Sequence, residues 1–233
     1  MRTIPIVSLA VIVMFSPALS GEIGFQGAGG FCFAVYTPDL APFNKELKAL
    51  GIPEFSGSML LYGGQGFGHV SEHLRVGGMG FGGSMRTQDF ENGYAREATF
   101  SMSWGGILIE YWFLEALNCE FYAGGTLGWG AVALRLEKTA SPVDWDDVWG
   151  NFQADSSMAE NVSSEFQHSF FLMQPRLGIR YFLLDWLALS GTVEIPLLKL
   201  SSDGWELNGD NVYDAPELDL MQPFFQFSIL LGG

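Results

Sequence analysis

Residues 171–181 read FLMQPRLGIRY, and their side chains alternate between two kinds. One face is apolar or aromatic: Phe171, Met173, Pro175, Leu177, Ile179 and Tyr181. The other face carries Gln174, Arg176, Gly178 and Arg180. A repeat of two residues is the repeat of a β-strand. The same alternation returns within 187–197 and 221–231, and within 99–108 the apolar face of Phe100, Met102, Trp104 and Leu108 opposes Thr99, Ser101, Ser103 and Gly105. The chain therefore predicts several amphipathic strands.

Long aromatic segments with strand chemistry recur along the chain. The eight predicted strands are Gly24–Tyr36, Gly57–Gly68, Leu74–Thr87, Arg96–Phe113, Cys119–Glu137, Glu165–Phe182, Trp186–Leu200 and Leu218–Leu231. The segments between them alternate in length. Short connections are expected at 69–73, 114–118 and 183–185, an intermediate one at 88–95, and long ones at 37–56, 138–164 and 201–217.

Alternation alone does not say which face of a strand lies inside. A soluble sandwich buries its apolar face, whereas a membrane barrel turns that face outward and keeps the polar face inside. Here the polar faces are mostly Gly, Ser, Thr and Gln, with far fewer charges than a water-exposed surface carries. Glycines also crowd the strands at 27–30, 63–66 and 77–83, which eases curvature. Trp112, Tyr181 and Trp186 fall near the expected short turns, as an aromatic girdle at the membrane border would. These features favour the membrane barrel.

From Gly21 to Gly233 the chain resembles the small eight-stranded outer-membrane β-barrel proteins of Gram-negative bacteria. The resemblance implies an all-β fold: an eight-stranded, up-and-down antiparallel transmembrane β-barrel with short periplasmic turns and long extracellular loops. One departure concerns the last residues. Such barrels usually finish on an aromatic residue, whereas residues 225–233 here read FQFSILLGG.

The first residues resemble a cleaved signal peptide. Arg2 supplies a positive charge, residues 4–15 form an apolar run too short to span a bilayer as a helix, and Ala18 and Ser20 are small residues at a cleavage site. We therefore predict a signal peptide at 1–20 and one barrel domain at 21–233, exported to the cell outer membrane.

Composition excludes two other classes of protein. Hydrophobic residues make up 48% and charged residues 16%, which is unlike a disordered chain. Lys and Arg number 11 against 26 Asp and Glu, a formal net charge of −15, so binding to nucleic acid is not expected. The two cysteines, Cys32 and Cys119, could form one bridge in an exported chain, but they are expected to pack separately as small apolar residues because no dense cysteine framework is present.

Charges on the polar faces of neighbouring strands are the first candidate site. Arg176 and Glu194 are equidistant from the turn near 185 and should pair across the ladder, with Arg180 nearby. We expect Arg176, Arg180 and Glu194 to form an internal salt bridge that plugs the lumen, because an unpaired charge in a narrow lumen is costly. A role in conducting ions or binding substrate is the alternative.

Two motifs could support hydrolysis. Residues 69–73, HVSEH, match the H-x-x-E-H string of inverted zinc peptidases, but that chemistry needs a helix and this string lies between glycine-rich strands. We interpret it as a solvated turn. His168 lies near Ser164, Glu165 and Ser169, as in a lipid-modifying hydrolase, yet no G-x-S-x-G elbow is present.

The long connections carry two further features. Asp144, Asp146 and Asp147 could form a weak cation site that bridges to lipopolysaccharide phosphates through divalent ions, although a solvated acidic loop is the simpler interpretation. Residues 42–50 predict a short helix framed by Pro42 and Gly51, with Phe43, Leu47 and Leu50 on one face. This helix is expected to pack on the rim of the barrel.

The sequence therefore predicts a non-enzymatic surface or structural protein of the outer membrane, with no cofactor and no catalytic or metal-binding residue. Its expected partners are the lipid bilayer and lipopolysaccharide, while a protein partner is not identified. Two alternatives stay open: a soluble exported lipocalin-like barrel that binds a small apolar ligand inside, and the outer-membrane lipid hydrolase built on His168.

Overall fold

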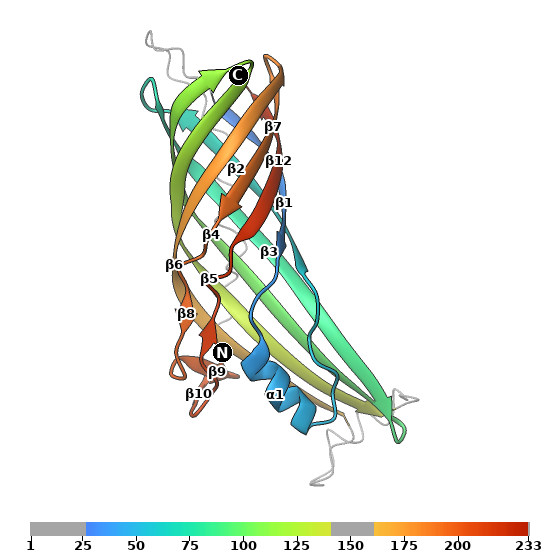
Figure 1. Ribbon diagram of the computed structural model, residues 1–233. Helices are drawn as coiled ribbons and strands as arrows, with labels where there is room; N and C mark the ends of the chain where they lie inside the picture. Colours follow the sequence, from blue (N-terminus) through green and yellow to red (C-terminus); the bar gives the residue numbers. More distant parts are fainter. Residues whose placement is uncertain (1–26, 141–160, 233) are drawn as a thin grey trace.

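Eight antiparallel strands close into a ring in the computed structural model, which describes residues 27–140 and 161–232 (Figure 1). The ring strands are β1 (Gly27–Tyr36), β2 (Met59–His69), β3 (Leu74–Glu91), β4 (Tyr94–Ala116), β5 (Cys119–Ala140), β6 (Val162–Leu184), β7 (Leu187–Glu194) and β12 (Phe224–Gly232). Each strand pairs with its neighbour in the ring, and β12 pairs with both β7 and β1 to close it. The predicted eight-stranded, up-and-down antiparallel barrel is confirmed.

The two ends of the barrel differ, as expected from the connection lengths (Figure 1). One end holds the short turns at 70–73, 117–118 and 185–186. At the other end lie the helix α1 (Ala41–Ala49) and the short strands β8 (Lys199–Leu200), β9 (Trp205–Leu207), β10 (Asp210–Val212) and β11 (Leu218–Asp219). We call these the short-turn end and the loop end.

The predicted connection at 88–95 is wrong. Strands β3 and β4 stay paired as far as Glu91 and Tyr94, so only two residues form the turn. Asn92 and Gly93 have φ values of 54° and 83°, the left-handed conformation that a two-residue hairpin turn requires. The hairpin therefore extends well beyond its neighbour β2 at the loop end, whereas β5 on its other side stays paired with it as far as Tyr94 (Figure 1).

Prolines interrupt the last hairpin. Glu194 pairs with Phe224, and Lys199 pairs with Asp219 in the same register, so β7–β8 and β11–β12 follow one continuous ladder. Pro196 and Pro223 lie within the gap, and neither can donate a backbone hydrogen bond. The two predicted strands at 186–200 and 218–231 are thus each divided in two.

Helix α1 packs on the loop end of the barrel. Its Phe43 ring lies 6.2 Å from the ring of Phe100 on β4 and 5.6 Å from that of Trp205 on β9. Phe43 and Leu47 are buried as predicted, whereas Leu50, the C-cap residue, is 51% exposed, so its predicted place on the packed face is wrong. The hairpin of β9 and β10 pairs with β6 beside it. Among the described residues, no helix is long and apolar enough to cross a membrane.

Candidate functional site

Charged side chains fill the barrel toward its short-turn end. Of the residues that the structure describes, six charged ones are buried, three arginines and three glutamates: Arg75, Glu110, Glu120, Arg176, Arg180 and Glu194. They come from β3, β4, β5, β6 and β7, where strand alternation turns them inward. Their formal charges cancel within the barrel.

The first part of this network joins four strands of the wall. The guanidinium of Arg75 lies 2.7 Å from the carboxylate of Glu120, which is also 3.2 Å from Arg180. Arg180 reaches across the lumen to Glu110 at 2.9 Å. Since Glu110 is on β4 and Arg180 on β6, this contact is made through the interior rather than along a ladder.

The second part contains the pair expected from the sequence. Arg176 lies opposite Glu194 in the β6–β7 ladder, and their charged groups are 3.2 Å apart. Arg176 also lies 3.5 Å from Glu110, which links it to Arg180. Gln174 donates a hydrogen bond to Glu194. Arginine and glutamate therefore alternate in one connected chain through the lumen.

Neutral side chains complete the filling of this half. The Arg176 guanidinium donates to Gln65 at 3.2 Å and to Thr192 at 3.3 Å. The Tyr122 hydroxyl lies 2.8 Å from that of Thr192, and its ring lies 4.8 Å from the guanidinium carbon of Arg180. Gly178 leaves the room for Tyr122, because a Cβ at Gly178 would lie 2.5 Å from the tyrosine hydroxyl. The result is a packed polar interior.

Sequence reasoning identified Arg176, Arg180 and Glu194 but missed Arg75, Glu110 and Glu120. Glu110 follows Leu108 on a face that was grouped as apolar, and its contact with Arg180 depends on closure of the barrel. The alternation of β5 does place Glu120 and Tyr122 on one face. Because Glu120 shares this face and pairs with Arg180 across the β5–β6 ladder, Glu120 could have been predicted from the sequence as a member of the network.

Toward the loop end the interior becomes apolar. On β4, the buried side chains include Phe100, Met102, Trp104 and Leu108, and the Trp104 ring lies 6.0 Å from that of Phe224 on β12. The expectation that this face of β4 points outward is therefore wrong: it points inward, and Ser103 lies outside. Together with residues of α1 and β9 these side chains form one hydrophobic core.

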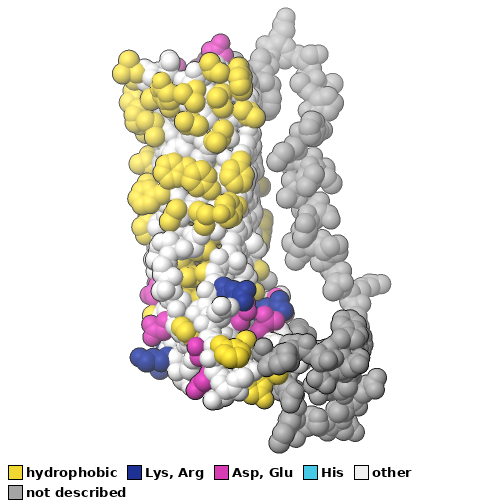
Figure 2. Space-filling model, turned by 90° about the vertical axis from the view of Figure 1, so that its right-hand side faces the viewer, with side chains coloured by type: hydrophobic (Ala, Val, Ile, Leu, Met, Phe, Trp, Pro, Cys, Tyr) yellow, Lys and Arg dark blue, Asp and Glu magenta, His cyan; other side chains and the backbone are white. Residues whose placement is uncertain are grey.

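The outer wall shows the opposite arrangement. Exposed apolar side chains surround the barrel on its short-turn side, among them Phe31, Tyr62, Ile107, Leu127, Trp129, Phe171, Leu177, Ile179, Val193, Phe227 and Ile229. Figure 2 shows apolar side chains dominating this part of the face in view, whereas charged ones gather toward the loop end. We call this surface the apolar belt.

Aromatic side chains mark both borders of the belt. Trp129 is 67% exposed, and its ring packs at 5.4 Å against that of Phe171 on the loop-end side. Tyr181 and Trp186 are exposed at the short-turn side. Phe171 and Tyr181 are ten residues apart on β6, about 26 Å of height for a strand tilted as in a barrel. Trp112, expected on this border, instead packs inside against Arg75, 4.5 Å from its guanidinium carbon.

Beyond the belt, the outward faces of β3–β6 become polar. Arg86 pairs with Glu97 at 2.6 Å, and Arg135 pairs with Glu137 at 2.6 Å, on partly exposed side chains. Along β6, the outward residues change from Phe171 to Ser169, Gln167 and Glu165 within three steps of the alternation. Each of these strands thus reverses its amphipathic sense partway along its length.

The histidines of the two hydrolytic motifs make other contacts in the part of the chain that the structure describes. His69 accepts a hydrogen bond from Arg75 at 2.6 Å, and the His73 ring stacks on Tyr111 at 5.8 Å. The described residues contain no cluster of three or more His, Cys, Asp or Glu suited to a metal ion. Both ring nitrogens of His168 lie at backbone carbonyls, 2.8 Å from Ser169 and 3.1 Å from Asp203, rather than at a serine hydroxyl.

The remaining sequence expectations concern the cysteines and the acidic loop. Cys32 and Cys119 are both free, Cys32 being buried. Asp144, Asp146 and Asp147 lie outside the described residues.

Comparisons with known proteins give structural matches only. No protein-family model and no curated protein matches the sequence. Among solved structures, Ail of Yersinia pestis, determined in complex with the heparin analogue sucrose octasulfate, is similar at 7% identity over 90% of this chain and 97% of its own, with a TM-score of 0.46. OprG of Pseudomonas aeruginosa is similar at 12% identity over 90% of this chain and 95% of its own, with a TM-score of 0.46. CarO of Acinetobacter baumannii is similar at 13% identity over 88% of this chain and 96% of its own, with a TM-score of 0.41.

Proposed function

We propose that this chain is a non-enzymatic outer-membrane barrel with a closed lumen, which anchors a surface-exposed, folded loop end in the cell envelope. The observation that carries the proposal is the reversal of amphipathic sense along the strands. Near the short turns, charges lie inside and apolar side chains outside; near the loops, the arrangement is inverted. A barrel half immersed in lipid requires this reversal, because each half is adapted to its own solvent.

The dimensions of the belt support a membrane location. Its height of about 26 Å along β6 agrees with the band of about 25 Å that flanking aromatic residues enclose in outer-membrane barrels. The aromatic residues at its two borders, such as Trp129 and Trp186, have one apolar side and one polar group suited to an interface. The loop end then projects from the membrane as a small soluble core.

The interior supports a closed rather than a conducting barrel. Arg176 and Glu194 have no exposed side-chain surface, and the network balances three positive against three negative charges. An ion crossing this half would have to separate buried pairs, which is costly. In the other half it would meet the apolar core around Trp104 and Phe224. Two seals, the charged network of the short-turn half and the apolar core of the loop half, therefore block the lumen one after the other.

The lipocalin-like alternative fits the surface less well. A soluble carrier of apolar ligands needs an apolar cavity and a polar exterior. At the short-turn end this barrel has ion pairs inside and side chains such as Leu177 and Phe227 outside. Such a surface would aggregate in water.

Sidedness and surface contacts complete the proposal. We place the short-turn end in the periplasm and the loop end outside the cell, after removal of residues 1–20 as a signal peptide. Divalent ions held by Asp144, Asp146 and Asp147 would bridge the loop end to lipopolysaccharide phosphates. Calcium-dependent protection of the loop from protease tests this bridge; protection that persists after all three are changed to Ala would contradict it.

Cell fractionation combined with heat-modifiability tests the proposed location. The full chain is expressed in a Gram-negative host, and boiled and unboiled samples of each fraction are compared on an SDS gel. We expect recovery in the outer membrane and a mobility shift on boiling. Recovery as a soluble periplasmic protein without detergent would refute the proposal and favour the lipocalin-like alternative instead.

A further inference from the structure

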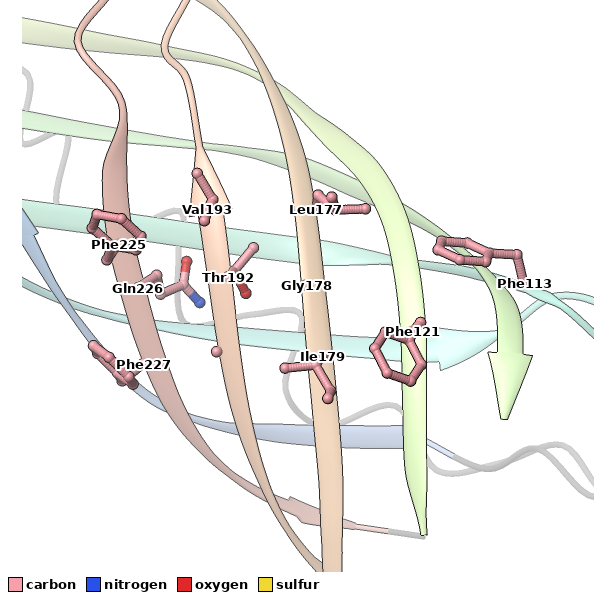
Figure 3. A pocket seen from close by; sticks show the side chains of 11 residues that line it. Phe113, Phe121, Leu177, Gly178, Ile179, Thr192, Val193, Phe225, Gln226 and Phe227 are labelled. Atoms are coloured by element: carbon pink, nitrogen blue, oxygen red, sulfur yellow. The ribbon is translucent and has the colours of Figure 1, made fainter. Parts of the chain in front are cut away.

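One part of the apolar belt is hollowed rather than convex. A groove of about 340 Å³ lies on the wall formed by β4, β5, β6, β7 and β12 (Figure 3). Its floor is at Gly191, an outward-facing position on β7 with no heavy atom within 4 Å of where a Cβ would lie. The missing side chain therefore leaves open space on the surface.

The ladders show how the groove is built. Gly191 pairs with Ile179 on β6 and with Phe227 on β12, so these two side chains flank it in one row. In the next row toward the loop end stand Leu177, Val193 and Phe225 (Figure 3). All five of these side chains are exposed and apolar. The slot is thus one residue wide, with aliphatic and aromatic walls.

The position of the groove indicates what can occupy it. Gly191 lies four residues from the start of β7 at Leu187, so the groove is inside the apolar belt and nearer its short-turn border. The medium at that depth is hydrocarbon if the chain spans a membrane. A flexible methylene chain fits a narrow slot without charged or hydrogen-bonding walls, and the nearby border would place its headgroup at the short-turn interface.

We propose that this groove holds one acyl chain of a phospholipid from the leaflet at the short-turn end. This inference rests on the proposed membrane location. Gly191 supplies the space, and Ile179 and Phe227 contact the chain from either side. One row of apolar side chains flanks the slot toward the loop end and another toward the short-turn end: Leu177, Val193 and Phe225, and Tyr181, Leu189 and Ile229. The chain gains dispersion contacts on several sides, whereas a chain against a convex part of the belt has them on one side only.

A photoactivatable phospholipid with a diazirine in one acyl chain tests the groove. The protein is inserted into vesicles of phosphatidylethanolamine and phosphatidylglycerol, irradiated and mapped by peptide mass spectrometry. We expect labelling to be concentrated on residues 177–179, 187–194 and 224–232. Gly191→Leu should reduce labelling there at least fivefold, because its side chain fills the slot.

The matched control is Gly66→Leu. Gly66 also faces outward, lies in the same row of the belt as Gly29 and Leu231, and has room for a Cβ, with its nearest atom at 3.6 Å. This variant should leave labelling of the groove unchanged. Both variants must keep the mobility shift on boiling, which shows that the barrel is folded.

Three outcomes would overturn the inference. Labelling spread evenly around the belt, or labelling unchanged by Gly191→Leu, would show that no chain is held at the groove. Labelling of the groove that is absent at a high protein-to-lipid ratio and appears only on dilution in lipid would identify a second copy as the occupant. A protein that stays soluble and unlabelled would instead refute the proposed membrane location, so the two failures are distinguishable.

Discussion

Arg176 and Glu194 face each other across the β6–β7 ladder with their charged groups 3.2 Å apart, and neither side chain has exposed surface. Such a pair contributes little net stability when intact, since both groups lose their hydration, but loss of one partner leaves a buried charge without compensation. The lumen network should therefore respond very differently to single and to double substitution.

Replacement of Glu194 by Ala should destabilise the barrel by about 3–5 kcal/mol, because Arg176 stays buried without its nearest carboxylate. Urea titration of the refolded protein in detergent measures the free energy of unfolding. The matched control is Glu137→Ala on the outer wall, whose partly exposed pair with Arg135 should contribute less than about 1 kcal/mol. The double variant Arg176→Met, Glu194→Leu should recover most of the loss. A double variant no more stable than Glu194→Ala would contradict this account.

Conductance in planar bilayers should distinguish the two seals. The wild-type barrel should show no steady current. The variant Glu110→Ala, Arg180→Ala removes one link of the lumen network, yet it should also stay closed because the apolar core around Trp104 and Phe224 still blocks the other half. Steady channel openings in this variant would show that the charged network alone closes the lumen.

The turn at Leu117 and Asn118 holds the backbone of Leu117 in a strained conformation. Leu117 is 94% exposed and has a φ of 53°, a left-handed conformation that costs a residue with a Cβ roughly 1–2 kcal/mol. Leu117→Gly should therefore raise the free energy of unfolding by about 1 kcal/mol in the same urea titration. Leu117→Ala retains a Cβ and serves as the control, with no comparable gain expected. Equal stability of the Gly and Ala variants would refute the explanation by backbone strain.

The attachment of α1 should depend on Phe43. This ring is buried between Phe100 and Trp205, so Phe43→Ala removes a large apolar contact and should cost about 3–5 kcal/mol of local packing. The expected effect is rapid protease cleavage within 37–58, while the barrel keeps its mobility shift on boiling. Leu50→Ala is the control because Leu50 is exposed. Equal cleavage of both variants would contradict the proposed docking of the helix.

Much of the fold could be predicted from the period of two on a few strands. The alternation of β6, β7 and β12 predicted their outward faces correctly, including Leu177 and Phe227. For β4 it identified the two faces of the strand but assigned them the wrong way round at Phe100 and Trp104. A repeat of two residues shows that a strand has two faces. Which face turns inward depends on whether lipid or water surrounds that part of the barrel.

The candidate site was predictable only in part, for a related reason. Arg176 and Glu194 pair along a ladder, so their distance from one turn was sufficient to match them. Glu110 meets Arg180 across the interior, and that contact depends on the curvature of the closed barrel. The turn at Asn92 and Gly93 is different: an Asn-Gly pair between strands is a hairpin signal, and it could have been recognised.

Cysteine accessibility along the outer face of β6 tests the central claim most directly. In a background of Cys32→Ala and Cys119→Ser, single cysteines replace Gln167, Ser169, Leu177 or Ile179, all on the outward face of one strand. In vesicles, a membrane-impermeant maleimide should label positions 167 and 169 rapidly and positions 177 and 179 at least tenfold more slowly, whereas all four should react in the unfolded chain. Rapid labelling of all four positions in the folded, vesicle-reconstituted barrel would show that water surrounds its whole length and would contradict the proposed immersion of the short-turn half.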